Sequence, residues 1–294
     1  MAFVNTFDEV RANKIKSVLL IMFFVALIAF LGMLFGAYYG SAWSGLILAV
    51  FSGLIYVMIA YSFGDKMVLT MSGAKPVTKK EYPHLFHTVE GLALAAGLPT
   101  PKAYVIQSEA LNAFATGRDP KNAAIAVTTG LLKALKRQEL EGVVAHEMAH
   151  IKNLDIRMML LTSVLIGVVV MMSDFMLRSF LFGGRGKKSH PALMIVSLVF
   201  AILAPIIGHM IRLAISRKRE YLADASGALL TRYPEGLASA LEKIKGSPAK
   251  LDTANRAMAH LYISNPFGKV KGFFAKAFST HPPIDERISK LRNM

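Results

Sequence analysis

The residues best suited to chemistry lie in the pentapeptide HEMAH at residues 146–150. The surrounding stretch, residues 138–155, has the pattern of a helix, and the i, i+4 spacing places His146 and His150 on one helix face. Both imidazoles can then bind one Zn²⁺, while Glu147 can reach a water on that metal. A structural pair of core histidines is the alternative, but four buried ring nitrogens would then need partners. The spacing therefore predicts metal-assisted hydrolysis with Glu147 as general base.

A catalytic zinc site usually has three protein ligands and one open position, so a third ligand must lie elsewhere in the chain. There is no cysteine, and position 156, where one extended form of the motif has a third histidine, is Ile156. The best remaining candidate is Glu220, with Asp224 one helical turn later. This spacing suits a ligand followed by a carboxylate that orients a zinc-bound histidine. The sequence leaves open a solvated helix face on which Glu220 pairs with Arg217 or Arg219.

The composition indicates a membrane protein. Hydrophobic residues make up 54% of the 294 residues against 18% charged, which excludes intrinsic disorder and points to several membrane-embedded segments. The lack of cysteine excludes disulfide scaffolds, thiolate zinc sites and cysteine nucleophiles. The net charge of +15 is dispersed and no recognition motif accompanies it, so we expect lipid contacts rather than nucleic-acid binding.

Four apolar runs are long enough to cross a bilayer, and they form two hairpins. The first two, residues 18–39 and 43–63, contain no charged side chain and are joined by the uncharged residues 40–42. Lys and Arg flank this first hairpin on both outer sides, which places its ends in the cytoplasm. The later runs, residues 158–182 and 193–215, contain polar groups and are joined by a basic loop. That loop opposes the usual charge bias, so partial embedding of the second hairpin stays open.

Between the hairpins the sequence predicts a helix over residues 83–98 followed by three short strands. The strands lie at residues 102–107, 112–116 and 123–129, and the turn-forming residues 117–122 make the last two a β-hairpin. Because the metal ligands must meet at one ion, the two polar regions must share one side of the membrane. The chain then divides into a cytoplasmic N-terminal segment (1–17), a first transmembrane hairpin (18–63), a first catalytic part (64–157), a second hydrophobic hairpin (158–215) and a second catalytic part (216–294).

Four motifs together resemble a known family: HEMAH at residues 146–150, RKREYLADASG at 217–227, NAFATG at 112–117 and STHPPIDERI at 279–288. They are similar to the HtpX family of membrane zinc metalloproteases, relatives of the type I CAAX prenyl proteases. The resemblance covers most of the chain, including the four hydrophobic runs. It implies His146, His150 and Glu220 as ligands of one Zn²⁺ per chain, and Glu147 as general base. The expected fold is α+β: a mainly helical integral membrane protein with four hydrophobic helices and a zincin-like cytoplasmic catalytic domain that carries a small β-hairpin or sheet.

Further site residues follow from the same motifs. The resemblance implies that His281 and Arg287 stabilise the transition state, whereas the residues alone would make the HPP stretch a surface turn. If the strand that contains Asn112, Ala113 and Phe114 is an exposed edge strand, it could hold an extended substrate by backbone pairing. Such pairing gives affinity with little sequence demand.

The resemblance implies a zinc-dependent endopeptidase that cleaves misfolded or damaged membrane proteins at the cytoplasmic face of the bacterial inner membrane. The protein would be multi-pass, with both termini in the cytoplasm, and its partners would be polypeptide substrates and the lipid bilayer. The rival interpretation is a non-enzymatic transporter or scaffold with a structural metal site. In that case four polar residues within the second hairpin would mark a path across the bilayer: Asp174, Arg178, His209 and Arg212.

Overall fold

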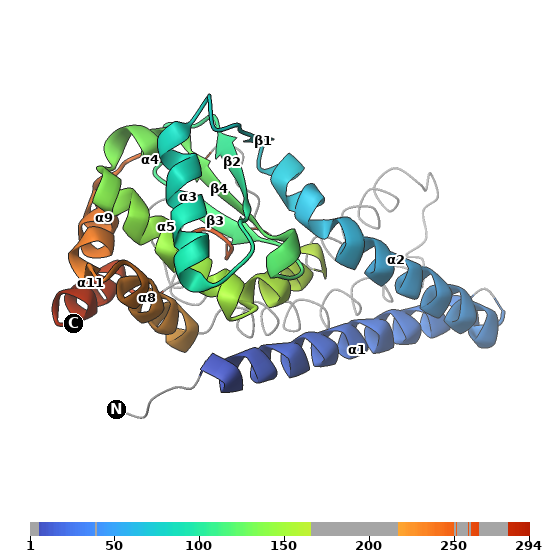
Figure 1. Ribbon diagram of the computed structural model, residues 1–294. Helices are drawn as coiled ribbons and strands as arrows, with labels where there is room; N and C mark the ends of the chain where they lie inside the picture. Colours follow the sequence, from blue (N-terminus) through green and yellow to red (C-terminus); the bar gives the residue numbers. More distant parts are fainter. Residues whose placement is uncertain are drawn as a thin grey trace.

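The computed structural model describes residues 6–38, 40–165, 217–249, 251, 258, 260–264 and 282–294. In these residues the protein is mainly helical with one small sheet, which confirms the predicted α+β class (Figure 1). The second hydrophobic hairpin lies outside the described residues from residue 166 onward, although residues 155–165 are helical. The prediction of four hydrophobic helices therefore stays a prediction.

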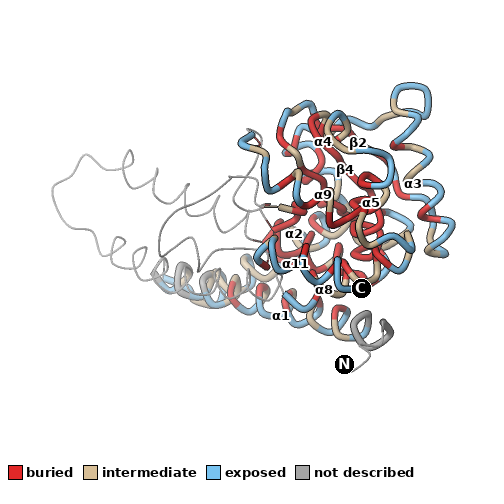
Figure 2. Tube along the Cα trace, turned by 90° about the vertical axis from the view of Figure 1, so that its left-hand side faces the viewer, coloured by how far each residue is buried: buried red, intermediate tan, exposed pale blue. Residues whose placement is uncertain are grey.

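Two long helices form the N-terminal hairpin. Helix α1 spans Thr6–Tyr38 and helix α2 spans Ala42–Met71, and both contain stretches long and apolar enough to cross a membrane. Large apolar side chains stay exposed on them, including Trp43 and Leu48. Figure 2 shows exposed residues along these helices, in contrast to the buried centre of the remaining structure. An apolar surface of this kind fits contact with lipid.

The two helices approach each other closely near the hairpin tip. A Cβ on Gly45 would lie 2.2 Å from the carbonyl oxygen of Gly32, so this crossing accepts only glycine. The turn itself uses Gly40 at a φ of +98°, and Ser41 caps α2 by accepting the backbone N–H of Ser44. The hairpin thus has a defined crossing and a defined turn.

A four-stranded sheet follows, in the order β1-β2-β4-β3. Strands β3 and β4 pair antiparallel, which confirms the predicted hairpin, and β2 corresponds to the predicted first strand. The sequence did not predict that β2 pairs parallel with β4, nor the short strand β1 that pairs with β2. The strand bounds are Ala74–Pro76 for β1, Lys102–Ile106 for β2, Ala113–Thr116 for β3 and Ala124–Thr128 for β4.

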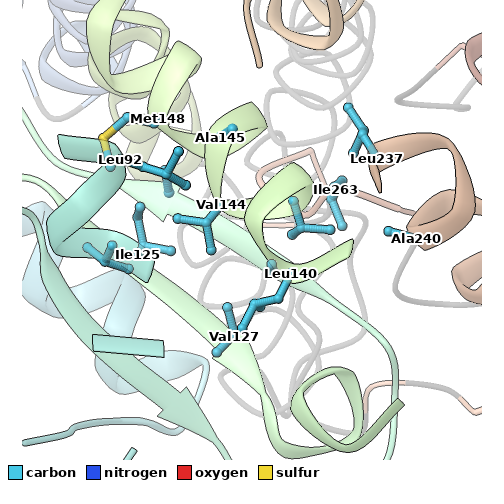
Figure 3. Packing of buried hydrophobic residues seen from close by; sticks show 14 of the residues in the cluster. Leu92, Ile125, Val127, Leu140, Val144, Ala145, Met148, Leu237, Ala240 and Ile263 are labelled. Carbon is cyan, nitrogen blue, oxygen red and sulfur yellow. The ribbon is translucent and has the colours of Figure 1, made fainter. Parts of the chain in front are cut away.

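Strands β3 and β4 are buried on both faces of the sheet. Along β4, Ile125 and Val127 point to one face and join the core formed with helices α3 (Pro83–Ala96) and α5 (Arg137–Lys152), as Figure 3 shows. Ala126 points to the other face, where the end of α2 and the helical residues after the α5 turn pack. Cover on both sides explains why β3 and β4 are buried at every residue rather than at alternate residues.

Helix α5 lies at the centre of the catalytic part. Its N-terminal end follows the short helix α4 (Thr129–Ala134), and it packs against α3, α8 (Arg217–Thr231) and α9 (Pro234–Gly246). The C-terminal helix α11 (Ile284–Arg292) packs on α9 and α8. The segment before the second hydrophobic hairpin and the segment after it therefore form one structure.

Candidate active site

Helices α5 and α8 bring the three predicted metal ligands together. The Nε2 atoms of His146 and His150 lie 3.2 Å apart. Glu220, in the first turn of α8, places Oε2 3.7 Å from His146 Nε2 and Oε1 3.6 Å from His150 Nε2. All three side chains are buried, and one ligand atom from each lies within 4.8 Å of the others. The alternative of a solvated Glu220 on an exposed helix face is therefore wrong.

A glycine allows α8 to approach α5 at this point. A Cβ added to Gly227 would lie 2.9 Å from the backbone nitrogen of His146, which is shorter than real Cβ contacts. Gly227 is the last residue of the RKREYLADASG motif, two turns after Glu220. The motif therefore combines a ligand with the small residue that lets that ligand reach the other helix.

Both histidines have their outer ring nitrogen beside a carboxylate. His146 Nδ1 lies 2.9 Å from Asp224 Oδ1, and His150 Nδ1 lies 2.9 Å from Asp155 Oδ2. An ionised carboxylate only accepts hydrogen bonds, so a neutral His150 ring donates from Nδ1 to Asp155 and directs its Nε2 lone pair inward. His146 Nδ1 lies at ion-pair distance from Asp224 but is not aligned for a hydrogen bond in the described structure. The expected role of Asp224, to orient a ligating histidine, agrees with this placement.

These residues fit a bound metal ion. Zinc held tetrahedrally at about 2.0–2.2 Å separates neighbouring ligand atoms by about 3.3–3.6 Å, close to the separations found here. Burial by itself lowers the pKa of His150, but the Asp155 carboxylate and the charge of Glu220 outweigh it and raise that pKa to about 9. The surroundings thus favour a positive charge at the point where the two inward lone pairs and the Glu220 carboxylate converge.

Glu147 is buried beside the ligands and has an oxygen available. Its Oε1 has no hydrogen-bond partner in the described part of the chain. Burial raises the pKa of the Glu147 carboxyl above its ordinary value, and this outweighs the opposing effect of the neighbouring histidines. The backbone amide of Ala115, at the edge of the sheet, also acts on this carboxyl and favours its charged form. Such a group can accept a proton and release it again.

Arg287 is fully buried next to the predicted metal ligands. Its guanidinium donates two hydrogen bonds to Asp224, from Nε at 2.8 Å and from Nη2 at 2.7 Å. Nη2 also lies 3.5 Å from His146 Nε2, and Nη1 lies 3.8 Å from Glu220 Oε2. Burial alone would raise the pKa of the Asp224 carboxyl, but Arg287 holds it well below its usual range. His281, the other residue of this motif, lies outside the described residues.

The strand expected to hold substrate lies at the edge of the sheet, but it is not exposed. The four residues of β3, Phe114 included, are buried in the described structure. The carbonyl of Ala113, which points away from β4, already accepts the backbone N–H of Ile263 at 2.9 Å. The Asn112 side chain donates to the carbonyl of Ser264 at 3.2 Å. The expectation of an exposed edge is therefore corrected, because a segment 150 residues later in the chain lies against it.

Two residues around the site were missed by the sequence analysis. Asp155 was placed at the end of the predicted helix, but α5 ends at Lys152 and Leu154 adopts a φ of +59°, which turns Asp155 back toward His150. The turn-forming residue Asn153 was the available signal. The second is Asn13 of α1, whose Nδ2 donates to Asp155 Oδ1 at 2.7 Å, and no local pattern could have indicated it.

Comparisons with known proteins agree with this geometry. A family model described as Peptidase family M48 matches residues 79–294. Relatives named "Protease HtpX homolog" include that of Tropheryma whipplei (strain Twist), 44% identical over 98% of this chain and 98% of the relative. The homologue of Dictyoglomus turgidum is 45% identical over 98% of this chain and 94% of the relative.

A solved structure shows the same fold. The crystal structure of S. mikatae Ste24p matches 92% of this chain with a TM-score of 0.52 and 19% identity. The chain spans 62% of that protein's length.

The matched region includes both helices that carry the His-His-Glu group, and the relatives extend over the apolar N-terminal hairpin as well. The relatives are proteases, which favours an enzyme over a transporter or scaffold. The chain belongs to peptidase family M48 and is a membrane metalloprotease.

Proposed function

We propose that this protein is a zinc-dependent endopeptidase that cleaves polypeptides, among them misfolded or damaged membrane proteins, at the cytoplasmic face of the membrane. The observation that carries the proposal is the convergence of His146 Nε2, His150 Nε2 and the Glu220 carboxylate within 4.8 Å, with Glu147 buried beside them. These three residues would hold the metal. The donor set of two imidazoles and one carboxylate is that of a catalytic zinc site.

A zinc ion in this place supplies a Lewis acid that polarises the scissile carbonyl and lowers the pKa of water. Glu147 takes the proton of the attacking water on its carboxylate, for which the buried Oε1 is available. It then gives this proton to the nitrogen of the leaving amine. Burial, which raises the pKa of Glu147, brings the group closer to the value at which both transfers are efficient.

We further propose that Arg287 has two roles. It fixes Asp224, and through it His146, by the paired hydrogen bonds to the carboxylate. It also brings positive charge within 3.8 Å of the Glu220 carboxylate, close to the position where a negative oxygen would develop. His281, six residues earlier in the same motif, would be a second donor for that oxygen.

The edge of β3 is proposed as the place where substrate backbone binds. The segment that contains Asn112, Ala113 and Phe114 leads to Ala115, whose amide acts on the Glu147 carboxyl. Because Ile263 occupies the carbonyl of Ala113 and β3 is buried throughout, an extended peptide would have to displace the segment around Ile263 before it could pair with this edge. Backbone pairing requires few particular side chains, so broad substrate choice would follow.

We also propose a multi-pass arrangement in a bacterial inner membrane. In it α1 and α2 cross the bilayer with their uncharged tip outside, and both termini lie in the cytoplasm. The support is the Lys and Arg content of the flanking segments and the exposed apolar surface of both helices. The active site would then lie at the membrane surface.

Glu147→Gln tests the proposed chemistry most directly. Glutamine keeps the shape of the side chain but cannot accept the proton, and Glu147 is not a ligand, so the variant should keep its zinc and lose proteolysis. Zinc content of the purified protein and cleavage of an unfolded membrane protein in detergent are the two measurements. Glu141→Gln, on the same helix with a partly exposed side chain, is the matched control and should keep both properties. Substantial cleavage by the Glu147 variant would contradict its role as base.

A further inference from the structure

Asn13 belongs to the membrane helix α1, yet its side chain is buried in the catalytic part. Its Nδ2 donates two hydrogen bonds, to Asp155 Oδ1 at 2.7 Å and to the carbonyl of Asn153 at 3.0 Å. Both partners can only accept, so the amide nitrogen must face them. Figure 1 shows the N-terminal end of α1 beside the catalytic part, while its other end extends away together with α2.

The Asp155 carboxylate links Asn13 to His150, a proposed metal ligand. Asp155 receives Asn13 on Oδ1, and its Oδ2 lies 2.9 Å from His150 Nδ1. A carboxylate is planar, so a donor that fixes one oxygen also sets the direction of the other. Among the described residues, Arg219 is the cation nearest to Oδ1, and its Nη1 lies at 3.8 Å, beyond hydrogen-bond distance. In the described part of the chain, the short bond from Asn13 is therefore the closest restraint on the orientation of Asp155 from outside the α5 turn.

Anchoring of α1 alone does not explain an asparagine at this position. The buried stripe of α1 continues with Leu20 and Phe24, which pack against Leu161 and Leu165 and attach the helix by apolar contact. Asn13 is 1% exposed, and its Oδ1 has no hydrogen-bond partner in the described part of the chain. Burying an amide in this way costs free energy that an apolar side chain would avoid.

We propose that Asn13 is a positioning residue for the metal site. Through Asp155 it holds His150 with its Nε2 lone pair directed at the metal position, so that metal affinity depends on a residue of the membrane helix. This inference rests on the proposed function, because it requires that His150 binds the metal. Loss of the group bonded directly to a ligating histidine, here Asp155, typically weakens metal binding 10–100-fold, and Asn13, which acts through Asp155, should contribute a smaller part of that effect.

The test measures zinc affinity of the full-length protein in lipid nanodiscs by competition with a chromophoric chelator. Asn13→Ala should measurably weaken zinc binding, by up to about tenfold, which is less than the loss expected when Asp155 itself is removed. Asn13→Asp should weaken it further, because a carboxylate would face the Asp155 carboxylate and the Asn153 carbonyl. The matched control is Ser17→Ala, one turn along the same buried stripe, where the hydroxyl donates only to the carbonyl of residue 13 in its own helix and affinity should be unchanged.

Two further variants separate positioning from mere attachment of the helix. Leu20→Ala removes apolar contact between α1 and the catalytic part, and it should lower the thermal midpoint without lowering zinc affinity. In the double variant with Asp155→Asn, Asn13→Ala should have no additional effect on affinity, because Asn13 acts through Asp155. An equal loss of affinity in Leu20→Ala, or additive losses in the double variant, would overturn the inference.

The outcomes distinguish the two proposals. If the unchanged protein does not bind one zinc tightly, the proposed function fails. If it does, and the Asn13 variants bind zinc equally well, only the inference fails. Should Asn13→Asp not fold, Asn13→Ala and Asn13→Ser decide the matter, since a serine side chain is too short to reach both acceptors.

Discussion

Each histidine of the site has a carboxylate beside its outer ring nitrogen, but the two carboxylates come from different regions of the molecule. His146 has Asp224 at Nδ1 and His150 has Asp155 at Nδ1, each at 2.9 Å. Asp224 belongs to α8, so the support of His146 comes from the second catalytic part. Asp155 lies just after α5, and its other oxygen faces the membrane helix α1.

The outer partners of the two carboxylates differ in strength. Asp224 receives two charge-assisted hydrogen bonds from the buried cation of Arg287. Asp155 receives one hydrogen bond at 2.7 Å from the neutral amide of Asn13. Paired bonds from a guanidinium are roughly twice as strong per bond as neutral ones and allow one geometry. We therefore expect the His146 side to be the more rigid of the two, while the orientation of Asp155 on the His150 side also depends on the contact with α1.

Glu220→Ala should have the largest effect, because Glu220 faces both histidines. Two imidazoles alone leave the ion under-coordinated, so the variant should lose most of its zinc, with an affinity loss greater than the 10–100-fold typical of outer partners. Zinc content after purification is the measurement. The control is Glu242→Ala on α9, an exposed glutamate that pairs with a surface arginine and should keep full occupancy. Full zinc occupancy in Glu220→Ala would show that the third ligand is another residue.

Arg287→Ala removes the hydrogen-bond partner of Asp224 on the His146 side of the site. It leaves the Asp224 carboxylate buried without its counter-charge, which typically destabilises a protein by about 3–5 kcal/mol. A clear fall in the thermal midpoint of the detergent-solubilised, metal-free protein is expected. Arg292→Ala, on the same helix α11 but at the surface, removes two exposed ion pairs, to Glu235 and Glu242, and should change the midpoint little. Equal midpoints for the two variants would mean that the Asp224 pair is not what makes this side rigid.

The sequence could predict those parts of the site whose residues lie close together in the chain. The ligand pair of α5 and the Glu220 and Asp224 pair of α8 each have a helical spacing that can be recognised in one sequence window. The turn of Asp155 back toward His150 depends on a single backbone change at Leu154, which helical periodicity does not reveal. The bond to Asn13 joins residues 142 positions apart, so only the packed structure shows it.

The sheet illustrates the same limit. The β3–β4 hairpin could be predicted because its two strands and the turn-forming residues between them lie close together in the sequence. The parallel pairing of β2 with β4, and the covering of Ala113 by Ile263, arise from contacts between distant segments. Local patterns predict elements, whereas the neighbours of an edge strand depend on the whole fold.

Gly227→Ala should weaken the packing of α8 against α5, with a smaller effect on the site than Glu220→Ala. The added methyl group would lie 2.9 Å from the backbone nitrogen of His146, so α8 must shift away from α5 and carry Glu220 with it. We expect weaker zinc binding than in the unchanged protein but better binding than in Glu220→Ala. Gly91→Ala in α3 is the control: a Cβ there meets nothing within 4 Å, and the change should stabilise the helix by about 0.5–1 kcal/mol. Unchanged zinc affinity in Gly227→Ala would show that α8 can adapt without moving its ligand.

The changes with the smallest expected effect on the protein are single cysteine substitutions, which test on which side of the membrane the active site lies. The chain has no cysteine, so single cysteines can be placed without removing any. Ser44→Cys lies near the hairpin tip and Ser289→Cys on helix α11, and both positions are exposed. If the tip is outside and the active site is cytoplasmic, a membrane-impermeant thiol reagent added to intact cells should label only Ser44→Cys, with Ser289→Cys labelled after the cells are opened. Neither change touches the site, so zinc content should stay as in the unchanged protein.

External labelling of Ser289→Cys would place the catalytic part outside the cytoplasm. The bond between Asn13 and Asp155 would then lie at the opposite membrane surface from the one the flanking charges predict.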